Sequence, residues 1–156
     1  MTAAEPRWLT EAEQRSWRAY VIGSERLRQR LNTELQEGHN LPLADYEVLV
    51  RLSEQPGCRM RMTVLADEVA QSKSRLSHQI SRLEQAGLVR RSNCPNDARG
   101  ILAQLTDKGM DQLRAAAPTH VEGVRDHLID LISPEERAVL ATVFERVQKH
   151  LDGCEP

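Results

Sequence analysis

The sequence predicts a mainly α-helical fold that contains one short β-hairpin, and two patterns carry this prediction. Apolar residues recur every three or four positions along several stretches of the 156-residue chain, as they do on helices with one buried face. Between residues 88 and 105, two short apolar runs instead flank a turn-forming segment, residues 95–100. Aromatic residues make up only 3% of the chain, so aliphatic side chains are expected to form most of the core.

The first predicted helix begins at a capping box and ends at Gly38. The side chain of Thr10 can accept a hydrogen bond from the backbone of Glu13, and the Glu13 carboxylate can accept one from Thr10 in return. This helix would extend over about 28 residues, or ~42 Å at 1.5 Å per residue. A second helix is expected to start at Pro42 and to end before Pro56.

Two short helices are then predicted close together in the chain. Residues 63–69 have apolar side chains at helical spacing, and Ser72 is a good N-cap for the helix that follows. Gly87 suits the left-handed residue that ends this helix. Two short helices about three residues apart form a helix-turn-helix, a motif whose second helix enters the major groove of DNA.

The second of these helices, residues 72–84, has more hydrogen-bonding side chains than folding requires. Its buried stripe needs only Leu76, Ile80 and Leu83. The other positions can donate hydrogen bonds, and they are Lys73, Ser74, Arg75, Ser77, His78, Gln79, Ser81 and Arg82. Such a surface suits the base edges and phosphates of a DNA groove, so we interpret this segment as a recognition helix.

A hairpin follows the recognition helix. Residues 88–92 and 101–105 are its two predicted strands, and its tip is polar and includes Arg99. A two-stranded wing joined to a helix-turn-helix makes a winged helix. The predicted fold class is therefore mainly α, a winged helix-turn-helix with further helices at both ends of the chain.

Several motifs occur together in an order that is typical of one bacterial family. They are Leu65-Ala66, Ser72-Lys73-Ser74, Ser77, Arg82-Leu83-Glu84, Gly87-Leu88-Val89, Asp97-x-Arg99, and Leu105-Thr106 followed by Gly109. Over most of its length the chain resembles the MarR family of transcriptional regulators. The resemblance implies a symmetric dimer that binds double-stranded DNA, with Arg99 in the minor groove and Asp97 orienting it. Ala70, Gln71, Cys94 and Ala98 depart from the usual family pattern without overturning it.

Charge is distributed unevenly along the chain, although the net charge is only −2. Between Arg59 and Gly100 there are eight basic and four acidic side chains, which leaves 13 basic and 19 acidic ones elsewhere. A basic module on an acidic body suits phosphate binding. We expect the following DNA-binding residues: Ser72, Lys73, Ser74, Arg75, Ser77, His78, Arg82, Arg90, Arg91, Asp97 and Arg99.

Within this set, two kinds of contact are expected. Base edges are assigned to the first exposed turns of the recognition helix, namely Ser74, Arg75, Ser77 and His78, with Arg75 selecting a guanine. Phosphates are assigned to Lys73, Arg82, Arg90 and Arg91.

Both ends of the chain are predicted to be dimerisation helices. Thr106 can cap a helix that runs past Pro118, where a kink or one distorted turn is expected. Ser133 and Glu136 form a second capping box that starts the last helix. The long helices at both ends of the chain have long apolar faces, and the rest of the chain is too small to cover them. A homodimer is therefore expected. The predicted organisation is residues 1–38 for dimerisation, 39–106 for DNA binding and 107–156 for dimerisation, in one intertwined domain.

The resemblance also implies a signal that releases DNA, through a small aromatic or phenolic effector or through cysteine oxidation. We predict that an effector would lie in a crevice lined by Trp17, Tyr20, His39, Tyr46 and Arg51. The alternative is that the three aromatic side chains only fill the core or an interface. Cys58, Cys94 and Cys154 show no metal-like spacing. Cys94 is the best candidate for oxidation because arginines flank it, but incidental thiols are favoured.

Other functions are poorly supported by the sequence. No glycine-rich phosphate loop, nucleophile elbow or paired carboxylates stand out, and the five histidines are scattered, so we expect neither an enzyme, nor a metal, nor a cofactor. No apolar run approaches the ~20 residues of a membrane span, and no signal peptide is evident, which predicts a cytoplasmic location. A winged helix that binds a protein partner is the main alternative. The cations Arg75, Arg82 and Arg99, spread over helix and wing, favour DNA.

Overall fold

The computed structural model describes residues 5–153, so Cys154 lies outside the described residues. Its elements are α1 (Glu11–His39), α2 (Leu43–Ser53), the 3-10 turn η1 (Pro56–Cys58), β1 (Arg59–Arg61), α3 (Met62–Glu68), α4 (Lys73–Gln85), β2 (Val89–Cys94), β3 (Asp97–Leu105), α5 (Asp107–His127), the 3-10 turn η2 (Ile129–Leu131) and α6 (Pro134–Asp152). The predicted mainly helical winged helix is confirmed. No helix in the described part of the chain is long and apolar enough to cross a membrane.

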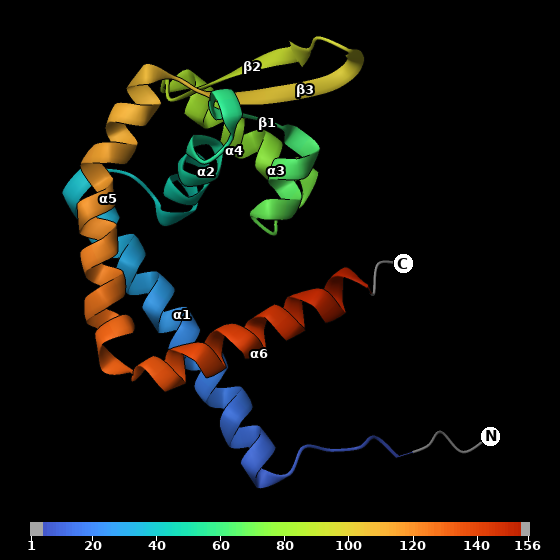
Figure 1. Ribbon diagram of the computed structural model, residues 1–156, viewed down its shortest axis with the longest axis vertical. Coiled ribbons are helices and arrows are strands. Elements are labelled where there is room, and N and C mark those ends of the chain that lie inside the picture. The colour runs from blue at the N-terminus through green and yellow to red at the C-terminus, as the bar shows by residue number, and fades with distance from the viewer. Residues whose placement is uncertain (1–4, 154–156) are drawn as a thin grey trace.

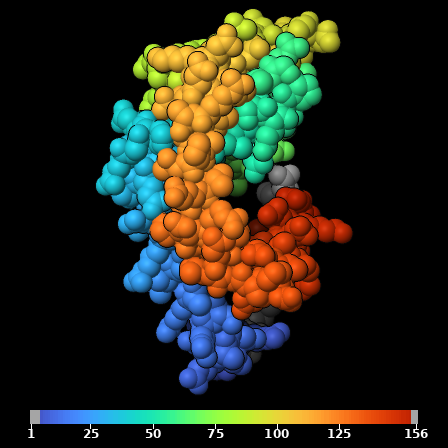
Figure 2. Space-filling view, turned by 60° about the vertical axis from the view of Figure 1, so that its left-hand side comes forward, coloured from blue at the N-terminus to red at the C-terminus, as the bar shows by residue number. Residues whose placement is uncertain are grey.

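The elements form a winged helix at one end of a long arm, which consists of helices α1 and α5 (Figure 1). Helices α1 and α5 pack along each other, and α2 contacts both of them. Helices α2, α3 and α4 and the small sheet cluster at one end of the arm, whereas α6 crosses α1 further down. Figure 2 shows α6 separated from the winged helix, while its start adjoins the end of α5. None of its residues is buried.

The sheet has three antiparallel strands in the order β1-β3-β2, rather than the two that the sequence predicted. Strands β2 and β3 form the wing, and their register pairs Val89 with Leu105 and Asn93 with Ile101. The added edge strand β1 pairs Met60 with Ala103. The sequence alone does not reveal β1, because the strand has only one buried residue between two arginines. Three residues are too few to show the alternation of apolar and polar side chains that indicates a strand.

The core joins the helix-turn-helix to the wing. The predicted stripe of α4 is confirmed, because Leu76, Ile80 and Leu83 are at most 3% exposed. They pack in one apolar cluster with side chains of α2, α3, β2 and β3. Gln79 is also buried, although the sequence placed it on the polar surface of α4. Its amide donates a hydrogen bond to Asp45 on α2 at 2.7 Å, which compensates part of the cost of burial.

The predicted helix starts agree with the structure at their caps, whereas α1 continues past the predicted end at Gly38 to His39, and Asn40 takes the left-handed conformation that ends it. Thr10 and Ser133 form complete capping boxes, and the side chains of Ser72 and Thr106 accept hydrogen bonds from the third residue of their helices. Gly87 has the expected positive φ of 77°. Ala70 also has a positive φ, 52°, a conformation that glycine adopts at a lower cost than alanine does.

The predicted course of the fifth helix needs one correction. Helix α5 continues through Pro118 and ends at His127, and η2 follows it instead of further α-helix. Leu131 lies in η2 and is 73% exposed in this chain, although its apolar side chain would favour the buried side of a longer helix. The chain turns at Leu128, whose φ and ψ of −142° and −62° are not helical, so the 3.6-residue periodicity no longer applies beyond it.

Candidate nucleic-acid interface

The first turns of α4 carry a set of exposed polar side chains that are not used by the fold. Ser72 caps the helix by accepting a hydrogen bond from the Arg75 backbone at 3.2 Å. The side chains that follow are exposed, and within residues 5–153 they make no hydrogen bond or ion pair; they are Lys73, Ser74, Arg75 and His78, which we call the open face of α4. Two cations, a hydroxyl and an imidazole are thus available to an outside partner.

Ser77 lies beside the open face but has a partner of its own. The guanidinium of Arg91, on β2, donates to the backbone oxygen of Ser77 at 2.6 Å and to its hydroxyl at 3.2 Å. It also donates to the hydroxyl of Ser81 at 3.0 Å. The Arg91 side chain is only 25% exposed and lies 3.6 Å from Glu84. Strand β2 is thereby fastened to the middle of α4.

Two of the other three cations expected at phosphates, Arg90 and Arg82, are also partly engaged. Arg90 donates to the side chain of Gln104 on β3 at 2.9 and 3.1 Å, so it faces along the sheet. Arg82 lies 3.6 Å from the buried carboxylate of Asp45, but its side chain remains 64% exposed. Arg82 can therefore reach an external anion more readily than Arg91 can.

The tip of the wing holds Arg99 through its backbone. The carboxylate of Asp97 accepts a hydrogen bond from the Arg99 backbone at 3.0 Å, and its other oxygen lies 3.3 Å from the guanidinium of Arg61. Asp97 thus shapes the turn, while the Arg99 side chain has no hydrogen bond or ion pair in the described chain. Arg61 is a cation of the interface that sequence reasoning missed, because it belongs to the unpredicted strand β1.

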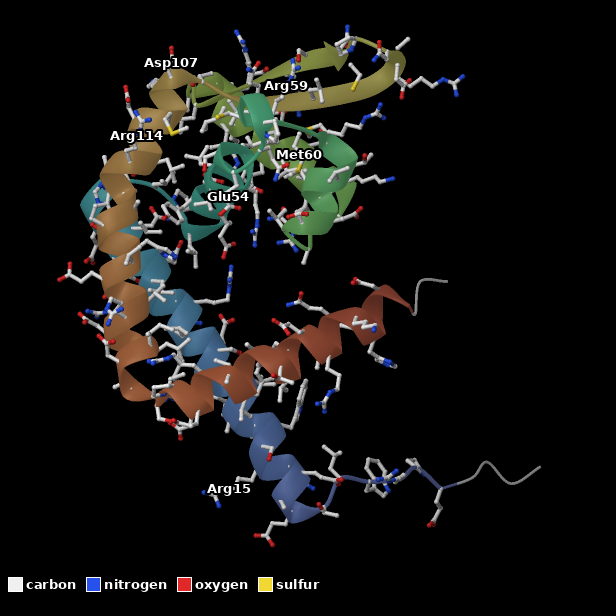
Figure 3. The ribbon with its side chains drawn as sticks, viewed as in Figure 1. Arg15, Glu54, Arg59, Met60, Asp107 and Arg114 are labelled. Carbon is white, nitrogen blue, oxygen red and sulfur yellow. The ribbon has the colours of Figure 1, made fainter. Side chains whose placement is uncertain are left out.

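Arg59 precedes Arg61 on the same edge strand (Figure 3). Both arginines are exposed, whereas Met60 between them is 8% exposed and belongs to the core. Cations therefore occur on α4, on the hairpin tip and on the sheet edge. This arrangement presents positive charge from three elements of the winged helix.

The comparisons with known proteins agree with this geometry. The MarR family model matches residues 41–101, which include the helix-turn-helix and most of the wing. AbsC, a MarR family transcriptional regulator from Streptomyces coelicolor, is 48% identical with a TM-score of 0.90, over 95% of this chain and 99% of AbsC. The chain belongs to the MarR family of transcriptional regulators.

Two further relatives extend the comparison. Sco3205, a MarR family transcriptional regulator from Streptomyces coelicolor whose crystal structure is in complex with DNA, is 42% identical with a TM-score of 0.90, over 97% of this chain and 93% of that one. The HTH-type transcriptional regulator PecS from Dickeya dadantii is 39% identical over 80 residues. That match covers 51% of this chain and spans about half, 48%, of PecS. These relatives of this MarR family chain are transcriptional regulators rather than enzymes.

A pocket of about 500 Å³ lies between the arm and the winged helix of this MarR chain. It is lined by Arg28, Tyr46, Glu47, Val50, Arg51, Glu68, Val69, Ala70 and His120. The rings of Tyr46 and His120 lie 4.5 Å apart. Burial raises the pKa of Tyr46 and lowers the pKa of His120, so both are neutral near pH 7. The buried Nδ1 of His120 has no hydrogen-bond partner within the described residues.

The structure brings only two of the five expected effector residues together. Tyr46 and Arg51 line this pocket. Tyr20 instead stacks between Trp17 and Phe144, at ring distances of 5.9 and 5.1 Å. His39 lies 2.8 Å from the hydroxyl of Thr119. Sequence analysis missed His120, because helical periodicity does not show how far along α1 and α5 the pocket lies.

The two described cysteines are free thiols. Cys94 ends β2 and is half-buried, and the ladder between β2 and β3 is irregular at this position. Within residues 5–153, no group of three histidine, cysteine or acidic residues has an arrangement that could hold a metal ion.

Proposed function

We propose that this MarR chain is a homodimeric, sequence-specific DNA-binding regulator that represses transcription from a pseudo-palindromic operator. The observation that carries the proposal is the open face of α4, which has four polar side chains without a partner in the described chain, next to an equally unpaired Arg99. The similarity of this chain to Sco3205, which was crystallised in complex with DNA, supports DNA as the partner. Repression then follows from occupying the operator and excluding other proteins.

Residue roles follow from which side chains are free. Ser74, Arg75 and His78 contact base edges in the major groove, with Arg75 paired to a guanine. Lys73 and Arg82 contact phosphates, and Ser72 orients the first turn as its cap. Arg99 enters the minor groove beside them. Arg90 contacts a phosphate only if it leaves Gln104, so its contribution is smaller.

The dimer in this proposal is supported by apolar surface that the chain leaves uncovered. Exposed apolar side chains lie on α1 and α6, and they are Trp17, Tyr20, Val21, Ile22, Val139, Leu140, Val143, Val147 and Leu151. A patch of this kind marks an interaction site. A second copy of the chain covers it, so that residues 1–38 and 107–156 form the dimer and residues 39–106 form each DNA-binding unit. Two α4 helices about 34 Å apart then meet successive major grooves.

Salt dependence and two arginine variants test DNA binding. We expect the affinity for duplex DNA to fall steeply and linearly with salt on logarithmic axes. Arg99→Ala should weaken binding to every sequence while the dimer persists. Arg75→Ala should in addition relax base preference, by roughly 1–3 kcal/mol at the contacted pair.

Arg15→Ala serves as the control, because Arg15 lies at the far end of α1 from the winged helix (Figure 3). Binding should be measured by fluorescence anisotropy on duplexes selected from a random pool. Weak binding that is insensitive to salt for every duplex would instead support a protein partner.

The pocket supports a small aromatic or phenolic effector as the signal for release. Tyr46 offers an aromatic wall, and Arg51 is 45% exposed with a loose 3.4 Å contact to Glu54, so its guanidinium can turn to a ligand carboxylate. Salicylate should therefore lower DNA affinity, and Arg51→Ala should raise the salicylate concentration needed by about ten-fold, as loss of a charge-assisted hydrogen bond implies. Val64→Ala, on α3 and outside the pocket, should respond as wild type does. No change in DNA affinity with salicylate would count against this effector class.

A further inference from the structure

The guanidinium of Arg91 contacts the recognition helix α4 at two successive turns. It donates to the hydroxyl of Ser81 and to both the carbonyl and the hydroxyl of Ser77. The Arg91 backbone also donates to the carboxylate of Glu84 at 2.8 Å. Because these contacts use both terminal nitrogens, they fix the plane of the guanidinium against α4.

These contacts occupy one of the two acceptor positions of the Ser77 hydroxyl. A serine hydroxyl has one proton to donate and two lone pairs to accept with, whereas an arginine can only donate. The hydroxyl of Ser77 therefore accepts from Arg91. Within the described chain no acceptor is recorded for its proton, since Ser81 donates to the Ser77 carbonyl rather than accepting. Ser77 is exposed, so its proton is available to an outside group.

We propose that Arg91 is a positioning residue that makes Ser77 a hydrogen-bond donor to DNA, so that Ser77 selects a base edge that accepts. This inference rests on the proposed DNA binding. In the major groove, guanine presents the acceptors N7 and O6, adenine presents N7 and thymine presents O4, whereas cytosine presents an amino donor. With one lone pair taken by Arg91, Ser77 is biased towards donating and disfavours cytosine at the base it faces.

This role differs from the phosphate contact that the sequence suggested for Arg91. A phosphate-binding arginine is expected to be exposed, with its donors free. Arg91 is 25% exposed against 64% for Arg82, and its charge is offset by Glu84 at 3.6 Å. Its neighbour Arg90 donates instead to Gln104 on β3.

The experiment compares base preferences of variants. Duplexes are selected from a random pool by the wild-type protein, and each base of the selected half-site is then varied in turn. Ser77→Ala and Arg91→Lys should each lose about five-fold of the preference at the same base pair, the size expected for one hydrogen bond. The double variant should lose no more than the larger single loss, because both changes remove the same contact.

Two controls sharpen this test. Ser77→Thr keeps the hydroxyl and should keep the preference, and Arg114→Lys, at an exposed position on α5 outside the winged helix, should leave it unchanged. An equal loss of affinity for all duplexes in Arg91→Gln, which removes the charge, with a salt slope shallower by about one, would make Arg91 a phosphate contact and overturn the proposal. An unchanged preference in Ser77→Ala, an exposed position that does not affect folding, would also overturn it. Absence of duplex binding by the wild-type protein would instead refute the proposed function itself.

Discussion

Replacing both Val143 and Val147 by glutamate is expected to convert the protein to a monomer and to weaken its binding to the selected duplex by about 100-fold or more. The two valines lie one turn apart on α6 and are 42% and 43% exposed in the single chain. In the proposed dimer they are covered, so each glutamate would bring a carboxylate into an apolar interface at a high cost. A monomer has one recognition helix and loses the advantage of binding two half-sites at once.

Val64→Glu is the matched control for this experiment, because Val64 is 44% exposed but lies on α3. Its mass by light scattering should remain that of a dimer. The double α6 variant should elute as a monomer and should bind a full site and a single half-site with similar affinity. A dimeric mass for this variant would show that α6 does not form the interface.

The second large effect is on stability, at Gly109. This residue lies in the first turn of α5, where a Cβ would stand 2.1 Å from the backbone oxygen of Leu88 and 2.7 Å from the side chain of Leu105. A backbone oxygen cannot rotate away as a side chain can. Gly109→Ala should therefore push α5 away from the start of β2, and it should destabilise the protein by about 3 kcal/mol, as severe overpacking does.

The measurement is the thermal unfolding midpoint at fixed protein concentration, because a dimer's midpoint depends on concentration. The shift for Gly109→Ala should be about −6 to −12 °C. Gly38→Ala is the control, since nothing lies within 4 Å of the added Cβ and the position is helical. Alanine there should stabilise by roughly 0.5–1 kcal/mol. A midpoint for Gly109→Ala at or above the wild-type value would contradict the predicted clash.

The sequence was most informative where structure is set by neighbours in the chain. The caps at Thr10, Ser72, Thr106 and Ser133 were predicted correctly, because a cap depends on residues three positions apart. The buried stripe of α4 was predicted for the same reason. These local signals were enough to identify the winged helix and its family.

The sequence was less informative where residues distant in the chain meet. Burial of Gln79 depends on Asp45, 34 residues earlier, and the orientation of Arg91 depends on Ser77, 14 residues earlier. Likewise, Trp17 and Tyr46 share the predicted apolar character but belong to different clusters. Neither charge nor periodicity encodes these pairings, so the side chains that are free to bind DNA can be separated from engaged ones only in three dimensions.

The third strand of the sheet divides the wing into two mechanically different parts. Strand β1 pairs only with residues 102–104 of β3, and α3 follows it directly. The base of the hairpin is therefore fastened on both sides and moves with the helix-turn-helix. Between residue 102 and the tip of the hairpin the sheet has only two strands, β2 and β3. Such a ribbon twists more easily than a wider sheet. In the proposed DNA complex, Arg99 lies on a flexible tip above a rigid base, so it can follow local variation in groove width while α4 stays fixed.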